Sequence, residues 1–153
     1  MKMTEQVTKK TTWLPKESLI ITEIKGALSI KDIEEWESSL NSTLNELPDN
    51  TRFRIFVDMF GFAPMDVEVH KRFREIIPLT LAKYGWKVGY LNMFKEADNL
   101  LLSRERGISC VKAAHAHQDS YKIEEYDRRF GSETEHFFTD SNKALAWLRE
   151  NSA

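Results

Sequence analysis

The order in which strand and helix patterns follow one another constrains this chain more than any single motif. Residues 19–24 read Leu-Ile-Ile-Thr-Glu-Ile, and residues 53–59 and 135–139 carry similar runs that are typical of strands. Between them, apolar residues recur every three or four positions, as on one face of an amphipathic helix. The clearest set is Ile30, Ile33, Trp36, Leu40, Leu44 and Leu47. This alternation predicts an α/β fold, with a mostly parallel or mixed sheet covered by helices.

Turn and cap residues predict where the first elements begin and end. The turn Pro15-Lys16-Glu17-Ser18 separates residues 8–14 from residues 19–24, so the fold should open with an antiparallel hairpin. We expect Gly26 to break the second strand. Ser29 with Asp32 three residues later is a weaker form of the capping box and predicts a helix start. Later helices are expected to begin at Asp66, at Asp119 and at Asp140 or Ser141.

The middle of the chain is less regular. Pro78 should kink the helix that begins after Asp66. An alternating run at residues 87–91 predicts a third strand, and residues 96–106 predict a helix that ends at Gly107. Residues 108–117 fit a strand or a short helix about equally well.

Length and composition limit the class of protein. The 153 residues are enough for one domain, which we place at residues 8–151, after a polar tail at residues 1–7 that we expect to be disordered. A net charge of −2 argues against a nucleic-acid partner, whose binding site would need a basic excess.

The same sequence carries signals about the compartment. Cys110 is the single cysteine, which excludes an intrachain disulfide and fits a reducing compartment. No apolar run is long enough for a transmembrane segment, and the first ten residues lack the apolar stretch of a signal peptide. We therefore expect a cytoplasmic protein.

Three stretches together resemble the STAS-like domains, and within them the SpoIIAA-like (STAS/SEC14-like) family. They are residues 21–29, residues 54–59 with the loop to Asp66, and residues 136–138 followed by the helix at 144–148. The resemblance implies a mixed sheet of four to six strands that starts with a hairpin, with helices packed mainly on one face. It implies no catalytic residue and no cofactor.

Two departures from the family pattern are visible. Anti-sigma antagonists of the STAS class use a phosphorylatable serine in an Asp-Ser pair, whereas the corresponding pair here is Asp66-Val67. Because valine cannot accept a phosphoryl group, we do not expect partner switching by phosphorylation at this site. The chain also has an extra segment at about residues 108–134, on which the resemblance is silent.

An apolar loop at residues 59–65 is the main candidate for a binding site. Loops are normally polar, and this one follows a strand, as does the segment at residues 91–94. If the two strands are parallel, both segments lie on the rim where open α/β sheets bind ligands. The candidate rim consists of Asp58, Met59, Phe60, Phe62, Met65, Met93 and Phe94.

This rim has three interpretations. A protein partner or a second copy of the chain would cover it, which is the reading we favour. Alternatively, it would form a groove for a small apolar or amphiphilic ligand such as a lipid. The third interpretation is that the side chains fold back into the core.

Histidines provide the candidate metal site. His115 and His117 would share one face on a strand but diverge on a helix, and Asp119 or His136 would have to supply a third ligand. Since two histidines are fewer than the three protein ligands typical of catalytic zinc, we predict no metal. Cys110 with His115 or His117 as its base is a still weaker catalytic candidate, because its apolar neighbours favour a buried thiol.

Two charged features complete the candidates. Asp58 and Asp66 would do acid–base work only if they met beside an apolar wall, and Asp66 already has a capping role. Residues 71–74, Lys-Arg-Phe-Arg, are expected on a solvated helix face from which they could meet an anionic head group near the rim. We therefore predict a non-catalytic regulatory or binding module.

Overall fold

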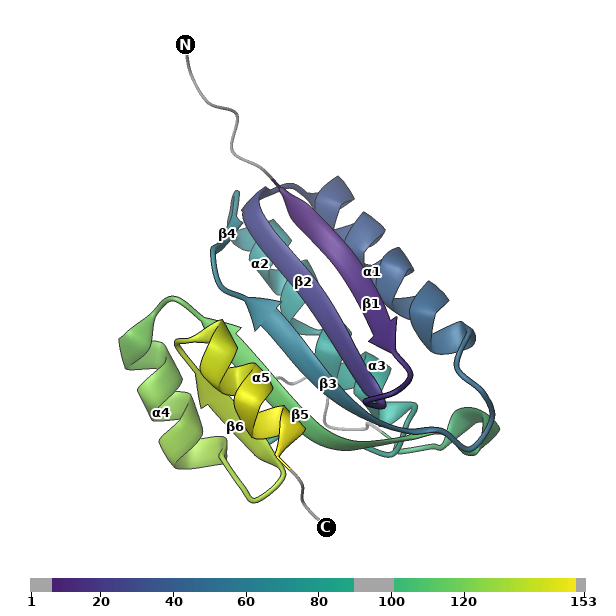
Figure 1. The fold of residues 1–153 in the computed structure, drawn as a ribbon. Helices are drawn as coiled ribbons and strands as arrows, with labels where there is room; N and C mark the ends of the chain where they lie inside the picture. Colours follow the sequence, from purple (N-terminus) through teal and green to yellow (C-terminus); the bar gives the residue numbers. More distant parts are fainter. Residues whose placement is uncertain (1–6, 90–100, 151–153) are drawn as a thin grey trace.

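The computed structural model describes residues 7–89 and 101–150. Six strands form one mixed sheet in the order β1-β2-β3-β5-β6, and β4 pairs with β2 (Figure 1). β1 is antiparallel to β2, and the other neighbours are parallel. The strands are β1 (Thr8–Leu14), β2 (Leu19–Leu28), β3 (Arg52–Met59), β4 (Phe62–Pro64), β5 (Ser109–His117) and β6 (Glu135–Phe138). The predicted α/β class and the opening hairpin are confirmed.

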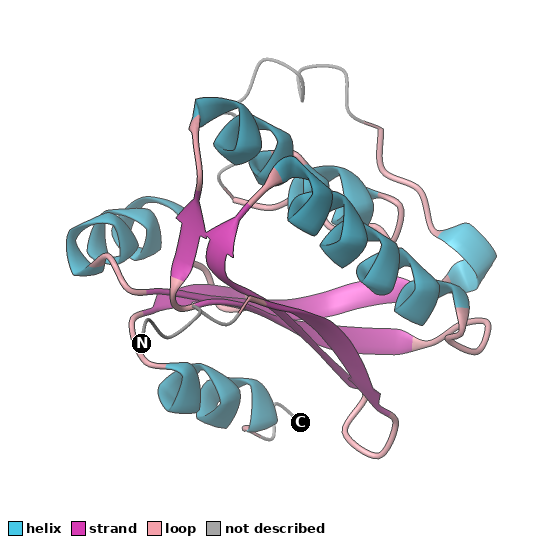
Figure 2. Cartoon of the chain, turned by 90° about the horizontal axis from the view of Figure 1, so that it is seen from above, coloured by secondary structure: helices cyan, strands magenta, loops and turns pink. Residues whose placement is uncertain are grey.

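The helices divide unequally between the two faces of the sheet. Figure 2 shows one helix, the last before the C terminus, below the sheet and the others above it. The helices are α1 (Ile30–Asn45), α2 (Val67–Arg74), α3 (Ile76–Ala82), α4 (Ser120–Phe130) and α5 (Ser141–Arg149), with a 3₁₀ turn, η3 (Glu105–Gly107). A large core lies under α1–α3, and a smaller one, with Phe56, Ala144 and Leu148, lies under α5.

α1 illustrates how local sequence signals and packing agree. The Ser29 side chain accepts a hydrogen bond from the backbone N–H of Asp32, and the Asp32 carboxylate accepts one from the N–H of Ser29. This is the predicted capping box. The apolar stripe of the helix is buried, and the indole Nε1–H of Trp36 donates to the Thr22 hydroxyl across 2.8 Å.

Gly26 does not end the second strand, contrary to our expectation. It adopts a φ of 100°, which glycine tolerates, and β2 continues to Leu28. The extension from Gly26 pairs with β4, so the segment we expected as an apolar loop contains a short strand. Pairing with β2 gives the backbone groups of β4 their partners, and the N–H groups of Phe60 and Gly61 donate to the side chains of Asp58 and Gln118.

The helix after Asp66 divides at Glu75 and not at Pro78. Glu75 ends α2 and begins α3, and Pro78 lies in the first turn of α3. A helix does not need the backbone N–H of its first-turn residues, so proline fits there without a kink of its own.

Two predictions for the middle of the chain are wrong where the structure describes it. Lys87, Val88 and Gly89 form no strand; the N–H of Gly89 donates to the Glu135 carboxylate across 2.9 Å. Residues 101–104 form no helix, and Leu101 and Leu102 are exposed, so a helix there would bury no apolar face. Residues 105–106 of the predicted helix lie in the 3₁₀ turn η3, and residues 90–91 and 96–100 lie outside the described residues.

Residues 108–134, which we treated as an extra segment, supply β5 and α4. Of the two structures that fitted residues 108–117, a strand or a short helix, the protein adopts the strand. This strand, β5, lies between β3 and β6 in the sheet. Its buried Ala113, Ala114 and Ala116 allow helices to pack closely on both faces.

Candidate functional site

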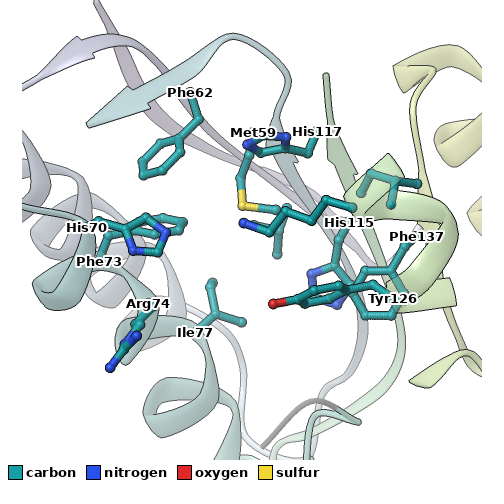
Figure 3. Close-up of a pocket in the computed structure, with 13 residues that line it drawn as sticks. Met59, Phe62, His70, Phe73, Arg74, Ile77, His115, His117, Tyr126 and Phe137 are labelled. Carbon is teal, nitrogen blue, oxygen red and sulfur yellow. The ribbon is translucent and has the colours of Figure 1, made fainter. Parts of the chain in front are cut away.

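A cavity of about 240 Å³ lies over β3 and β5, between α2 and α3 on one side and α4 on the other (Figure 3). Apolar and aromatic side chains form most of its lining. The other lining residues are histidines, one arginine and one lysine. The lining consists of Val57, Met59, Phe62, His70, Phe73, Arg74, Ile77, His115, His117, Lys122, Ile123, Tyr126 and Phe137.

The parallel register of the strands builds the floor of the cavity. Val57 lies opposite His115 and Met59 opposite His117, while His115 also lies opposite Phe137 of β6. Because alternate residues of a strand point to the same face, these five side chains project together toward α2 and α4.

Helical spacing builds the walls. His70, Phe73 and Arg74 are three and four residues apart on α2, so they lie on one face of that helix. Ile123 and Tyr126 do the same on α4. Phe62 from β4 packs on Phe73 with ring centroids 4.3 Å apart, which joins the strand to the helix wall.

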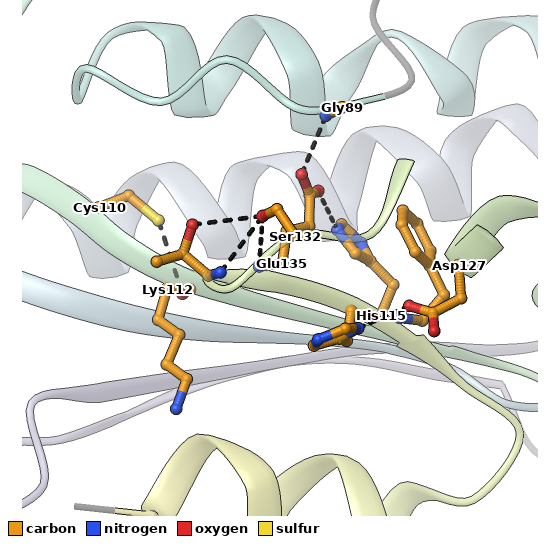
Figure 4. A network of polar contacts seen from close by, with 10 residues as sticks. Gly89, Cys110, Lys112, His115, Asp127, Ser132 and Glu135 are labelled. Atoms are coloured by element: carbon orange, nitrogen blue, oxygen red, sulfur yellow. Dashed lines mark hydrogen bonds and ion pairs between the residues drawn. The ribbon is translucent and has the colours of Figure 1, made fainter. Parts of the chain in front are cut away.

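A buried polar network holds one edge of the floor (Figure 4). His115 Nε2 lies 2.8 Å from Glu135 Oε2, and the second carboxylate oxygen of Glu135 accepts from the N–H of Gly89. His115 and Glu135 are only 1% and 3% exposed. The ring of His115 also stacks on Phe137, with centroids 4.6 Å apart, so its orientation is held from two sides.

The surroundings of the other two histidines of the cavity favour the neutral imidazole. Burial, and then the positive charge of Lys122, lower the pKa of His70 and the pKa of His117 below the ordinary value. His117 Nδ1 accepts a hydrogen bond from the N–H of Asp119 across 3.0 Å, so the neutral ring carries its proton on Nε2.

Arg74 and Lys122 give the cavity a positive charge. None of the described residues that line it is acidic. Lys122 forms no ion pair with a carboxylate within residues 7–89 and 101–150; its Nζ lies 5.8 Å from the ring centroid of Tyr126. The site therefore combines an apolar interior with two cationic side chains on opposite walls.

The predicted rim is divided by the structure. Met59 and Phe62 line the cavity, whereas Phe60 and Met65 are 44% and 65% exposed. Met93 and Phe94 lie outside the described residues. Residues 59–65, which we predicted to form one apolar surface, therefore place some side chains in the cavity and others in solvent.

Asp58 has a structural role that the sequence left unexplained. Its carboxylate lies 2.9 Å from Lys25 Nζ and accepts hydrogen bonds from the Ser141 hydroxyl and the N–H of Phe60. Asp66 caps α2 by accepting from the N–H of Val69. Each carboxylate is thus engaged in holding an element in place.

The histidine pair shares one face of β5, as the strand alternative required, but the proposed third metal ligands lie elsewhere. The Asp119 carboxylate caps α4, and His136 pairs with Asp127 across 2.8 Å and packs on Trp147 of α5. No group of three metal-ligating side chains forms among the described residues.

Cys110 is buried, and burial raises the pKa of its thiol. Its Sγ lies 3.8 Å from the carbonyl oxygen of Lys112. A protonated, enclosed thiol is a poor nucleophile, so this geometry gives no support to a catalytic cysteine.

Sequence reasoning missed most of the cavity. It did not connect His70 or α4 with the site, although Ile123 and Tyr126 belong to an apolar stripe. The only signal for cationic walls was the basic run at residues 71–74, of which Arg74 lines the cavity while Arg72 pairs with Glu37.

Comparisons with known proteins give no relative: no family model, no curated protein and no solved structure matches this chain. Among the described residues, no helix has the length and apolar character needed to cross a membrane.

Proposed function

We propose that this protein is a non-catalytic binding module whose cavity holds a small, largely apolar ligand. The observation that carries the proposal is the cavity of about 240 Å³ beneath α2, α3 and α4, in a region where close packing would be expected. Pockets for drug-sized ligands run from roughly 300 Å³ upward, and a cavity of about 150 Å³ accepts benzene. A ligand of intermediate size fits this space.

The acidic and thiol groups near the cavity are not part of its lining and are already engaged or enclosed, which supports binding over catalysis. Glu135 is occupied by His115 and Gly89, Asp58 by Lys25 and Ser141, and the thiol of Cys110 is enclosed. The SpoIIAA-like family and a cytoplasmic location stay predictions; the hairpin at the start of a mixed sheet is compatible with the family.

Native mass spectrometry and organic extraction of the purified protein test the proposal. We expect a small co-purifying molecule, or a raised melting temperature with eight-carbon compounds. Ile77→Phe should abolish both effects, because the larger ring would enter the cavity. Leu79→Phe is the matched control, since Leu79 lies on the same helix but is exposed. Equal binding by the two variants, or no binding by the wild type, would refute the proposal.

A second candidate function is self-association through exposed apolar side chains next to the cavity. Phe60, Met65 and Val67 are 44%, 65% and 67% exposed within one short segment. We propose a second copy of the chain as the occupant of this surface. Light scattering should detect a dimer that Phe60→Asp disrupts, whereas Tyr121→Asp, at an exposed aromatic residue of α4, should leave it intact. A wild-type monomer would exclude this candidate.

A further inference from the structure

We infer that the ligand of the cavity is an anion: a carboxylate or a phosphate monoester carried on a short apolar body. This inference rests on the proposed function, because it names the class of ligand for the same site. It starts from the distribution of charge. Arg74 and Lys122 line the cavity, and no described lining residue is acidic.

The two cations stand on opposite walls. Arg74 comes from α2 and Lys122 from α4, and the apolar floor of Val57, Met59 and Phe137 lies between the helices. An anionic group would meet Lys122 inside the cavity, and Arg74, whose guanidinium lies at the edge of the cavity in Figure 3, would add positive charge from the other wall, while the apolar body of the ligand would occupy the floor. Figure 3 shows the Tyr126 hydroxyl directed into the same space, so the polar end of a ligand would lie beside it.

Lys122 is placed in a way that its structural contacts do not explain. Lys122 is partly buried, and a partly buried lysine in a protein commonly has a carboxylate or carbonyl partner. Within the described residues, the Lys122 side chain instead has the ring of Tyr126, at a distance where cation–π attraction is weak. A bound anion would supply a counter-charge that the described residues do not.

The histidines of the cavity add donors without adding charge of their own. The Nε2–H of His117 is left as a donor because its Nδ1 accepts from Asp119. Burial is the main cause that lowers the pKa of His70 and of His117, and the positive charge of Lys122 acts on both rings in the same direction, with Arg74 adding to it at His70. Positive side chains in the lining repel a cationic ligand and attract an anionic one.

Titration calorimetry with matched probes tests the inference on the full chain. Octanoate, octyl phosphate and octanamide share the same apolar tail and differ in the charge of the head group. We expect octanoate or octyl phosphate to bind at least about tenfold more tightly than octanamide, as hydrogen bonds to charged groups allow. Tighter binding of either anion supports the inference, and the stronger of the two identifies the head group.

Charge-removing variants locate the effect. Lys122→Met and Arg74→Met should each weaken binding of the better anion by about tenfold and leave binding of octanamide unchanged. Lys71→Met removes the same charge from an exposed position of α2 and should leave all three affinities as they are. Since Lys122 and Arg74 are on different helices, a folding defect in one variant leaves the other as an independent test.

The outcomes separate this inference from the proposed function. If octanamide binds as tightly as both anions, the inference is overturned and the proposed function stands. An equal loss of anion binding in Lys71→Met and Lys122→Met would also overturn it, because the effect would then reflect net charge and not the cavity. If none of the three probes binds and no molecule co-purifies, the proposed function itself fails.

Discussion

The face of the sheet that carries α1–α4 is closely packed in one half and hollow in the other. Under α1, the side chains of Ile33, Trp36, Leu40 and Leu44 are fully buried against β1 and β2. Under α4, the same face holds a cavity, a buried His–Glu pair and two cations. One sheet thus supports two kinds of interior.

The difference has an energetic meaning. Filling an interior with apolar side chains gains dispersion contacts and removes apolar surface from water, whereas a cavity forfeits those contacts. We therefore expect the half under α1 to contribute more to the free energy of unfolding than the half under α4, where a cavity and polar groups replace apolar contacts. The following predictions test this division, beginning with the largest effect.

Trp36→Ala should cost about 3–5 kcal/mol in the free energy of unfolding, because it empties a large site in the closely packed half and removes the partner of Thr22. Urea denaturation followed by circular dichroism measures this. Trp147→Ala, at a half-buried tryptophan on the opposite face, should cost clearly less. A loss below about 1 kcal/mol for Trp36→Ala would contradict the assignment of stability to this half.

Glu135→Ala should cost about 3 kcal/mol, because it takes the carboxylate from a buried histidine and from the N–H of Gly89. The comparison is His136→Ala. The His136–Asp127 pair has the same 2.8 Å separation, but its side chains are 35% and 38% exposed, so the loss should stay below about 1 kcal/mol. Equal losses in urea denaturation would show that burial does not distinguish the two pairs.

Ile77→Phe should be close to neutral in stability, since the cavity beside Ile77 can accept the larger ring. Leu40→Phe makes a comparable enlargement in the closely packed half and should cost about 1–3 kcal/mol. The difference between the melting temperatures of the two variants measures how much more easily the half with the cavity accepts a larger side chain. Similar losses would mean that the cavity is not available to an added side chain.

The free energy of unfolding should fall modestly as the pH drops below about 6.5, the ordinary pKa of histidine. Burial and Lys122 lower the pKa of His70 and His117 in the folded state, with Arg74 acting on His70 and Asp119 partly opposing on His117. Below the ordinary value, the unfolded chain therefore binds protons that the folded protein does not, and unfolding is favoured.

Urea titrations between pH 7.5 and pH 5 would measure this decline, which we expect to be the smallest of the effects. The double variant His70→Gln and His117→Gln should flatten the curve. His136→Gln, at a histidine outside the cavity, is the control. An unchanged slope in the double variant would assign the decline to other groups.

Local signals in the sequence were sufficient for the ends of several elements. Ser29, Asp66, Asp119 and Asp140 cap the helices they were predicted to cap, because a cap depends on side-chain and backbone groups within three residues. The opening hairpin was equally predictable, since its turn and both strands are adjacent in sequence.

Predictions failed where distant contacts decide the outcome. The alternating run at residues 87–91 resembles a strand, yet Gly89 binds Glu135 from a segment far along the chain. β5 was ambiguous because a strand buried on both faces lacks the alternation that marks an exposed one.

By itself, the sequence determined an α/β fold, its helix caps and the apolar character of residues 59–65, because these follow from neighbouring residues. Only the tertiary structure decided that Met59 and Phe62 turn inward beside His117, and that α4 brings Lys122 opposite Arg74. The physical reason is that a cavity forms between elements. Its lining depends on strand register and helix placement, and these are set by packing across the whole sheet.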